Sequence, residues 1–233
     1  MLITLIVFWA MFVQTVAGFG GALVSMPLLV GVLGITTATP MVAAMAIVIE
    51  IILIVYYRHA LEIKTVRNLA LPSLIGLPVG VYFLTQIDAN IVTTALGVLL
   101  VAYALYALFS PSLPELKHPG WSYIAGFLAG VLNGAYNTSG PPVIIYGTFR
   151  RWEPAVFKSN LQGFFFVLSM ATLIVHLVVG NFTAEVWVSF LWTLPGIALG
   201  FLAGKAVEKR IDPIRFRQIV FVLLIVLGLR LLF

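Results

Sequence analysis

Long runs of apolar residues, separated by short polar connections, recur along the whole 233-residue chain. A run of about 20 apolar residues rises far enough, at 1.5 Å per residue, to cross a hydrocarbon core of about 30 Å. Because the runs lack polar alternation, they favour helices rather than barrel strands. The pattern therefore predicts an all-α polytopic membrane protein. Its predicted segments are 2–33, 38–57, 69–86, 91–109, 119–149, 154–178, 185–205 and 213–233.

Two of these segments, 2–33 and 119–149, are too long for one crossing and are interrupted. Each is broken by glycines followed by proline, in GFGGALVSMPLLV (18–30) and NGAYNTSGPPVIIY (133–146). Non-helical backbone is tolerated at membrane depth only where protein buries it or where it lines a wet cavity. We therefore predict two broken re-entrant hairpins whose tips approach each other near the midplane. The alternative is that the glycines and prolines only kink packed helices.

The order of broken and unbroken segments occurs twice along the chain. The stretch GLPVGVYFLTQID (76–88) aligns with GFLAGKAVEKRID (200–212). This predicts a duplication, in which each repeat is one hairpin followed by three unbroken helices. The predicted repeats are 1–110 and 119–233, joined by a linker at 111–118.

Charge predicts how the repeats face the membrane. Only 9% of the residues are charged, against about 25% in an average soluble domain, so no soluble domain is expected. The basic residues lie in short loops and form no stripe of the kind that binds nucleic acid.

The positions of these basic residues predict the orientation. If each broken segment enters and returns on one side, every Lys and Arg except Arg230 falls on the side that the positive-inside rule makes cytoplasmic. The two repeats are then inverted, and both termini lie outside.

The broken segments also predict an anion site. Pro141 and Pro142 suit the first turn of a helix, so one half-helix should begin near Gly140, and another near Ser25 to Pro27. Free N–H groups and positive dipole ends at these starts would bind an anion without a buried Lys or Arg. The predicted substrate-binding residues are Gly20, Gly21, Ser25, Asn133, Asn137, Thr138, Ser139, Gly140 and Asn160.

Three other polar residues each have two interpretations. Glu50 lies in the apolar run AMAIVIEIILIVYY, where an ionised carboxylate costs at least about 2.5 kcal/mol and usually marks a pathway or a proton relay. Glu50 is therefore a candidate for proton coupling, and the alternative is a carboxylate near the interface or packed on a neighbouring helix. Lys158 either adds positive charge beside an anion route or extends to the cytoplasmic surface. Gln14 either faces the site or bonds across helices.

Other features limit the function. The chain has no Cys, no HExxH motif and no P-loop, and no paired carboxylates lie at membrane depth. We therefore expect no enzymatic activity, no metal and no cofactor. Glycines spaced by four residues, as in Gly76 and Gly80, permit close helix packing, either within the chain or in a homodimer.

Around its two broken segments the chain resembles the sulfite exporter TauE/SafE family of membrane permeases, within the 4-toluene sulfonate uptake permeases. The resemblance rests on GFGGALVSMPLL in the first half and on GVLNGAYNTSGPPVIIYGTFRRWEPAVFKSNLQGFFF in the second. It implies transport of small anions such as sulfite, thiosulfate or sulfonates across the bacterial inner membrane. We expect a secondary transporter with alternating access, and an anion channel with the same central site is the alternative. The family often has Gly-Gly near the second tip, where this chain has residues 136–140.

Overall fold

The chain folds entirely into helices within the residues that the computed structural model describes, which are 1–109, 115–116, 118–208 and 210–232. Most of the predicted linker at 111–118 lies outside these residues. The all-α prediction is confirmed. The helices are α1 (Leu2–Ala17), α2 (Gly21–Leu33), α3 (Ile35–Tyr57), the 3₁₀ helix η1 (Arg58–Ala60), α4 (Ile63–Gln86), α5 (Ala89–Phe109), α6 (Trp121–Tyr136), α7 (Gly140–Phe149), α8 (Pro154–Val178), α9 (Ala184–Leu191), α10 (Leu194–Glu208) and α11 (Pro213–Leu232).

Several of these helices have the length and composition of membrane spans. In the described part of the chain, five stretches qualify: α3 with η1, α4, α5 from Asn90, α8, and α9 with α10. Both α1 and α2 are shorter apolar helices. Large apolar side chains such as Ile75 and Leu202 are exposed on the spans, as a surface that faces lipid requires. The fold is that of a multi-pass membrane protein.

The sequence predicted the start of one half-helix correctly and the start of the other incorrectly. Helix α7 begins at Gly140, with Pro141 and Pro142 in its first turn, as predicted. Helix α2 begins at Gly21, with Pro27 inside it, so the predicted start near Ser25 to Pro27 is wrong. The reason is a side-chain contact that the local pattern does not show. Oε1 of Gln14 accepts a hydrogen bond from the N–H of Gly21 at 2.6 Å and so caps the helix earlier.

The predicted unbroken helix at 185–205 is divided in two. Helix α9 ends at Leu191 and α10 begins at Leu194, with Pro195 in its first turn. Proline cannot donate to the preceding turn, so it is accommodated best where a helix starts. Thr193 lies in the break, and its hydroxyl donates to the carbonyl of Phe190 at 2.6 Å.

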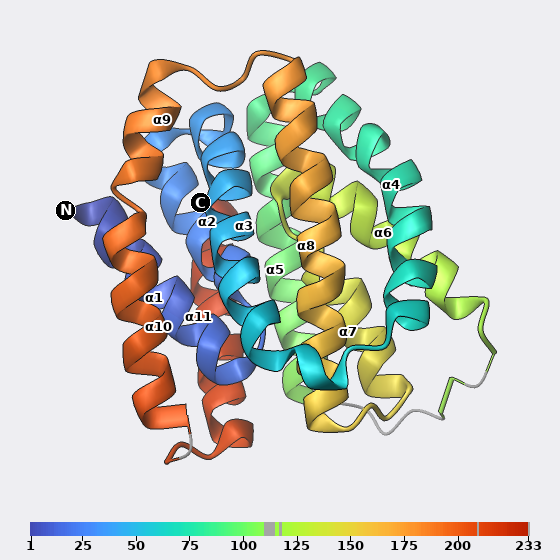
Figure 1. Cartoon of the computed structure of the whole chain (residues 1–233). Helices are drawn as coiled ribbons and strands as arrows, with labels where there is room; N and C mark the ends of the chain where they lie inside the picture. Colours follow the sequence, from blue (N-terminus) through green and yellow to red (C-terminus); the bar gives the residue numbers. More distant parts are fainter. Residues whose placement is uncertain (110–114, 117, 209, 233) are drawn as a thin grey trace.

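The loops collect at two ends of the molecule (Figure 1). Those after α3, α7 and α10 lie at the lower end of the view, and those after α4 and α8 lie at the upper end. The lower loops, 58–62, 150–153 and 210–212, contain Arg residues, whereas the upper loops, 87–88 and 179–183, contain neither Lys nor Arg. We call the lower end the basic end.

Helices from the two halves of the chain are interleaved. Helix α4 packs along α6, and α10 packs along α1. Glycines permit both contacts: a Cβ at Gly76 or Gly80 would overlap the α6 backbone, and Gly200 and Gly204 lie against α1. The four-residue glycine spacing therefore serves close packing within the chain.

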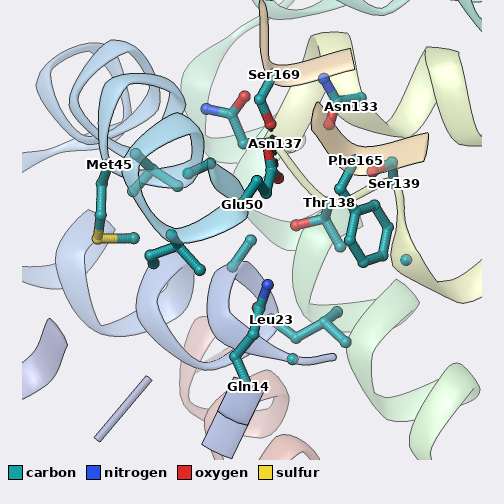
Figure 2. Close-up of a pocket in the computed structure, with 16 residues that line it drawn as sticks. Gln14, Leu23, Met45, Glu50, Asn133, Asn137, Thr138, Ser139, Phe165 and Ser169 are labelled. Atoms are coloured by element: carbon teal, nitrogen blue, oxygen red, sulfur yellow. Dashed lines mark hydrogen bonds between the residues drawn. The ribbon is translucent and has the colours of Figure 1, made fainter. Parts of the chain in front are cut away.

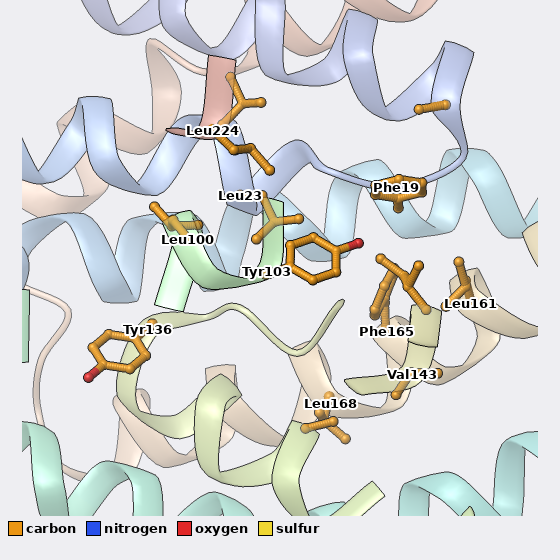
Figure 3. Packing of buried hydrophobic residues seen from close by; sticks show 14 of the residues in the cluster. Phe19, Leu23, Leu100, Tyr103, Tyr136, Val143, Leu161, Phe165, Leu168 and Leu224 are labelled. Atoms are coloured by element: carbon orange, nitrogen blue, oxygen red, sulfur yellow. The ribbon is translucent and has the colours of Figure 1, made fainter. Parts of the chain in front are cut away.

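A buried apolar cluster fixes the hairpins against the long helices (Figure 3). Phe19 and Leu23 come from the first hairpin, Val143 from the second, and Phe165 from α8. The ring of Phe19 also stacks on that of Phe221 in α11, with centroids 6.1 Å apart. Such packing holds both turns at defined positions inside the molecule.

Candidate functional site

The chain reverses direction at 18–20, between α1 and α2, and at 137–139, between α6 and α7. Gly18 and Gly20 have φ values of 84° and 103°, a region that glycine enters without a Cβ penalty. Asn137 has a φ of 50°, and Asn is one of the few other residues that adopt this conformation routinely. Both predicted interruptions are therefore sharp turns between packed helices.

A cavity of about 50 Å³ lies between the two turns (Figure 2). About 10–15 Å³ is enough to hold one water. The cavity therefore has room for a few waters or a small ion. Its walls come from both hairpins, α3 and α8, and among the described residues no Lys or Arg lines it. Its polar lining residues are Gln14, Glu50, Asn133, Asn137, Thr138, Ser139 and Ser169.

Most of the residues predicted to bind substrate meet at this cavity. Those that line it are Gly20, Asn133, Asn137, Thr138, Ser139 and Gly140. Gly21 and Ser25 do not line it. The N–H of Gly21 is bonded to Gln14, and the buried hydroxyl of Ser25 has no hydrogen-bond partner among the described residues.

Asn160 lies away from the cavity. Its Oδ1 accepts a hydrogen bond from the backbone N–H of Glu62 at 2.9 Å, which holds the turn before α4. The face of α8 that reaches the cavity carries Phe165 and Ser169. Successive helical residues are separated by about 100° around the axis, so Asn160 points to a different side of α8.

Several of the predicted donors hold the cavity wall together. Nδ2 of Asn137 donates to the backbone carbonyl of Thr39 on α3, and Nδ2 of Asn133 donates to Oγ1 of Thr172 on α8 at 2.6 Å. The hydroxyl of Thr138 donates to the carbonyl of Tyr136 at 3.0 Å. These groups therefore position the second turn against α3 and α8.

The start of α7 is the part of the wall best suited to an anion. The first N–H groups of a helix have no partner within it, and they carry the positive end of its dipole. Pro141 and Pro142 have no N–H, which leaves those of Ser139 and Gly140 at the start of the helix. Both of these residues line the cavity.

Glu50 places a carboxyl group in the same cavity. Its side chain is only 4% exposed, and the hydroxyl of Ser169 donates to Oε1 at 2.9 Å. Oε2 has no hydrogen-bond partner among the described residues, and none of the ion pairs found there includes Glu50. An ionised carboxylate in such surroundings is costly. Glu50 is therefore hydrogen-bonded to α8, as the alternative of a carboxylate packed on a neighbouring helix predicted, and its role in proton coupling stays a prediction.

Comparison with known proteins decides the family. Residues 3–231 match the family model described as "Sulfite exporter TauE/SafE". The chain belongs to this family. It is also 26% identical, over 229 residues, to a protein of Cupriavidus necator named "Probable sulfite/organosulfonate exporter TauE", covering 92% of this chain and 86% of that protein. No solved structure matches the chain. TauE/SafE proteins are membrane transporters, so the predictions of a transporter and of no enzymatic activity are confirmed.

Polar residues on α8 of this TauE/SafE transporter were not predicted as part of the site. Gln162, Ser169 and Thr172 are buried and face the hairpins and α3, where they bond to Gly18, Glu50 and Asn133 respectively. With Lys158 and Phe165, they recur at intervals of three and four residues, which places all of them on one face of the helix. That spacing is the sequence signal from which this face of α8 could have been predicted to meet the site.

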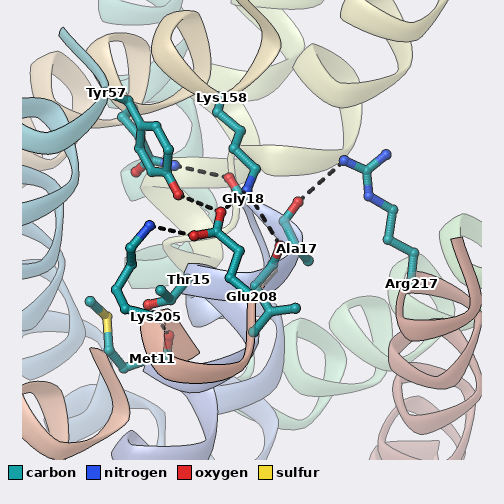
Figure 4. A network of polar contacts seen from close by, with 11 residues as sticks. Met11, Thr15, Ala17, Gly18, Tyr57, Lys158, Lys205, Glu208 and Arg217 are labelled. Carbon is teal, nitrogen blue, oxygen red and sulfur yellow. Dashed lines mark hydrogen bonds and ion pairs between the residues drawn. The ribbon is translucent and has the colours of Figure 1, made fainter. Parts of the chain in front are cut away.

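A second group that was not predicted lies at the basic end of the transporter (Figure 4). Glu208 at the end of α10 accepts hydrogen bonds from Lys158, Lys205 and the hydroxyl of Tyr57. Lys158 was expected either beside an anion route or extended to the surface. Its ammonium group instead lies 2.6 Å from Oε1 of Glu208, and its side chain is only 16% exposed. The ammonium group is therefore paired with Glu208 at the basic end, and its place beside an anion route stays a prediction.

Proposed function

We propose that this chain is a secondary transporter that moves a small sulfur oxyanion or organosulfonate by alternating access to the cavity between its two turns. The observation that carries the proposal is the start of α7 at Ser139 and Gly140, opposite Gly20, in a buried wall with no lysine or arginine among the described lining residues. A helix start of this kind binds oxyanions through backbone N–H groups. The related exporter is named for sulfite and organosulfonates, which are such anions.

An inverted repeat, 1–110 and 119–233, accounts for the helix arrangement. Helices α3 and α8 occupy corresponding places in the two repeats and run in opposite directions in Figure 1, as do α5 and α11. When α1–α5 is laid on α6–α11, the contact of α4 with α6 exchanges with that of α10 with α1. The contacts of α3 with α8 and of α5 with α11 map onto themselves. This symmetry suits rocking of one repeat against the other around a central site.

The orientation follows from charge. We place the basic end on the cytoplasmic side of the bacterial inner membrane, and both termini outside, because cytoplasmic loops carry the excess of Lys and Arg. The substrate would then enter the cavity from the cytoplasm past the loops 58–62, 150–153 and 210–212. The direction of net transport depends on the gradients.

Glu50 would couple the anion to a proton. An ionised carboxylate in a small cavity of low dielectric repels a second negative charge strongly. A neutral Glu50 removes that repulsion and offers an O–H group to an oxyanion. The anion and the proton would therefore occupy the cavity together.

Transport by purified protein in liposomes tests this function. We expect saturable uptake of labelled sulfite, thiosulfate or methanesulfonate, accelerated by the same anion on the opposite side. A non-saturating ionic conductance would indicate the channel instead. Uptake of none of these anions by folded protein would overturn the substrate class.

Gly140→Ala tests the cavity itself. The added methyl would lie 3.3 Å from the Ile144 side chain and 3.9 Å from Leu23 and Phe165, so the helix tolerates it while the cavity shrinks. The matched control is Gly31→Ala, which adds the same methyl to α2 in open space. We expect a raised KM only in Gly140→Ala, and equal KM values in the two variants would contradict the site.

A further inference from the structure

One face of α8 connects the cavity with the basic end. Ser169 and Phe165 line the cavity, Gln162 lies one turn below Phe165, and Lys158 lies one turn below Gln162. Nε2 of Gln162 donates to the carbonyl of Gly18 at 2.9 Å, and its Oε1 lies 3.5 Å from Nε2 of Gln14 in the cavity wall. A buried row of polar groups therefore runs from the cavity to Lys158.

At the end of this row, the carboxylate of Glu208 is bound by several donors, in the way that a small anionic ligand is bound in a site. Its Oε1 lies 2.6 Å from Nζ of Lys158 and 2.8 Å from the hydroxyl of Tyr57, and its Oε2 is bonded by Lys205. The donors come from α8, α3 and α10 and converge on one carboxylate (Figure 4). Two ammonium groups and a hydroxyl are donors that accept a sulfonate or sulfite oxygen equally well.

The charges at this site do not balance. Lys158 and Lys205 share the single carboxylate of Glu208, and Arg217 adds a third cation nearby, where it donates to the carbonyl of Ala17 at 3.3 Å. The side chains of the two lysines are only 16% and 21% exposed. A positive and partly buried cluster of this kind attracts small anions.

The same lysine holds the first hairpin. Nζ of Lys158 lies 3.5 Å from the carbonyl of Val16, and its aliphatic stem packs on Gly18. Partly buried ammonium groups lose stability if their carboxylate leaves and nothing replaces it. Glu208 can therefore leave at little cost only when another anion takes its place, and the connection that Lys158 makes between the turn at 18–20 and α10 is then broken.

We propose that Lys158, Lys205 and Tyr57 form a second anion site at the basic end, which Glu208 fills in the resting transporter and the transported oxyanion takes over on its way to the cavity. This inference rests on the proposed anion transport. When the substrate anion displaces Glu208, it is captured at this site and the first hairpin is released in the same step. An empty transporter then stays closed at this end, because Glu208 remains in place.

Thiol labelling tests the site separately from transport, because the chain contains no Cys. Ala17→Cys places a thiol at the buried turn, where Ala17 is 1% exposed. Methanesulfonate is the probe, since it does not react with thiols, and gluconate at the same ionic strength is the control salt. We expect methanesulfonate to accelerate labelling by a water-soluble maleimide about 5-fold to 10-fold.

Two charge variants in the Ala17→Cys background separate the roles of the groups. Glu208→Gln should label rapidly without any added anion, while the exposed control Glu153→Gln labels as slowly as the parent. Lys158→Gln should lose the acceleration by methanesulfonate, whereas Lys158→Arg and the exposed control Lys64→Gln should keep it.

The outcomes distinguish this inference from the proposed function. If methanesulfonate accelerates labelling as described but no sulfur anion is transported, the site stands and the proposed function fails. If transport is saturable but labelling is the same with methanesulfonate and gluconate, the second site is overturned. Slow labelling of Glu208→Gln would overturn it as well.

Discussion

The side-chain amide of Asn137 donates a hydrogen bond to the backbone carbonyl of Thr39. It thereby joins the second turn to the first part of α3. The backbone of Asn137 also has a positive φ of 50°. One residue therefore supplies both the shape of the turn and its attachment.

Substitutions at residue 137 separate these two contributions. Asn137→Gly keeps the backbone conformation and loses the hydrogen bond, whereas Asn137→Ala loses the bond and adds strain of about 1–2 kcal/mol. We expect both variants to transport slowly and the Ala variant to melt at the lower temperature, measured by tryptophan fluorescence. Equal melting temperatures would show that the backbone conformation carries no strain.

Glu50→Gln tests proton coupling. The neutral amide resembles the protonated carboxyl in shape and charge but cannot release a proton. We expect the variant to exchange anion for anion across the liposome membrane and to lose accumulation driven by a pH gradient. Glu62→Gln, an exposed change at the basic end, is the control and should keep both activities. Accumulation by Glu50→Gln at the parental level would exclude Glu50 as the coupling group.

Gly80→Leu tests the packing of α4 on α6. A Cβ at this position would overlap the carbonyl of Val131, so the helices must separate. Overpacking of this kind costs about 1–3 kcal/mol or more. We expect a clear fall in melting temperature, while Gly31→Leu, which points into open space, leaves it almost unchanged. A stable Gly80→Leu variant would mean that α4 and α6 are not tightly packed.

Single cysteines test the orientation. Glu62→Cys and Glu153→Cys are exposed at the basic end, and Glu185→Cys is exposed at the start of α9, near the other end. A maleimide that cannot cross membranes should label the first two only from the cytoplasm and the third only from outside. Labelling of residues 62 and 153 from opposite sides would rule out the inverted arrangement.

Local sequence signals predicted the turns and much of the cavity, because glycine, proline and Asn act within a few residues of where they stand. Pro141 and Pro142 fix the start of α7, and residues 137–140 form the wall beside it. Contacts between distant residues decided the rest. The hydrogen bond from Gly21 to Gln14 places the start of α2 earlier than its proline predicts. Asn160 lies away from the cavity because the opposite face of α8 meets the hairpins. The pairing of Lys158 with Glu208 joins two helices that no local pattern connects.

The contact of α1 with α10 also affects how the protein is made. Helix α1 leaves the ribosome well before α10, yet Gly200 and Gly204 lie directly against α1. At 5–20 residues per second, synthesis of the intervening chain takes on the order of ten seconds or more. During that interval the first hairpin waits in the membrane without the helix that will cover it. The packing of the first hairpin is therefore completed only after α10 has been synthesised, and a nascent chain that lacks α10 is a natural substrate for membrane quality control.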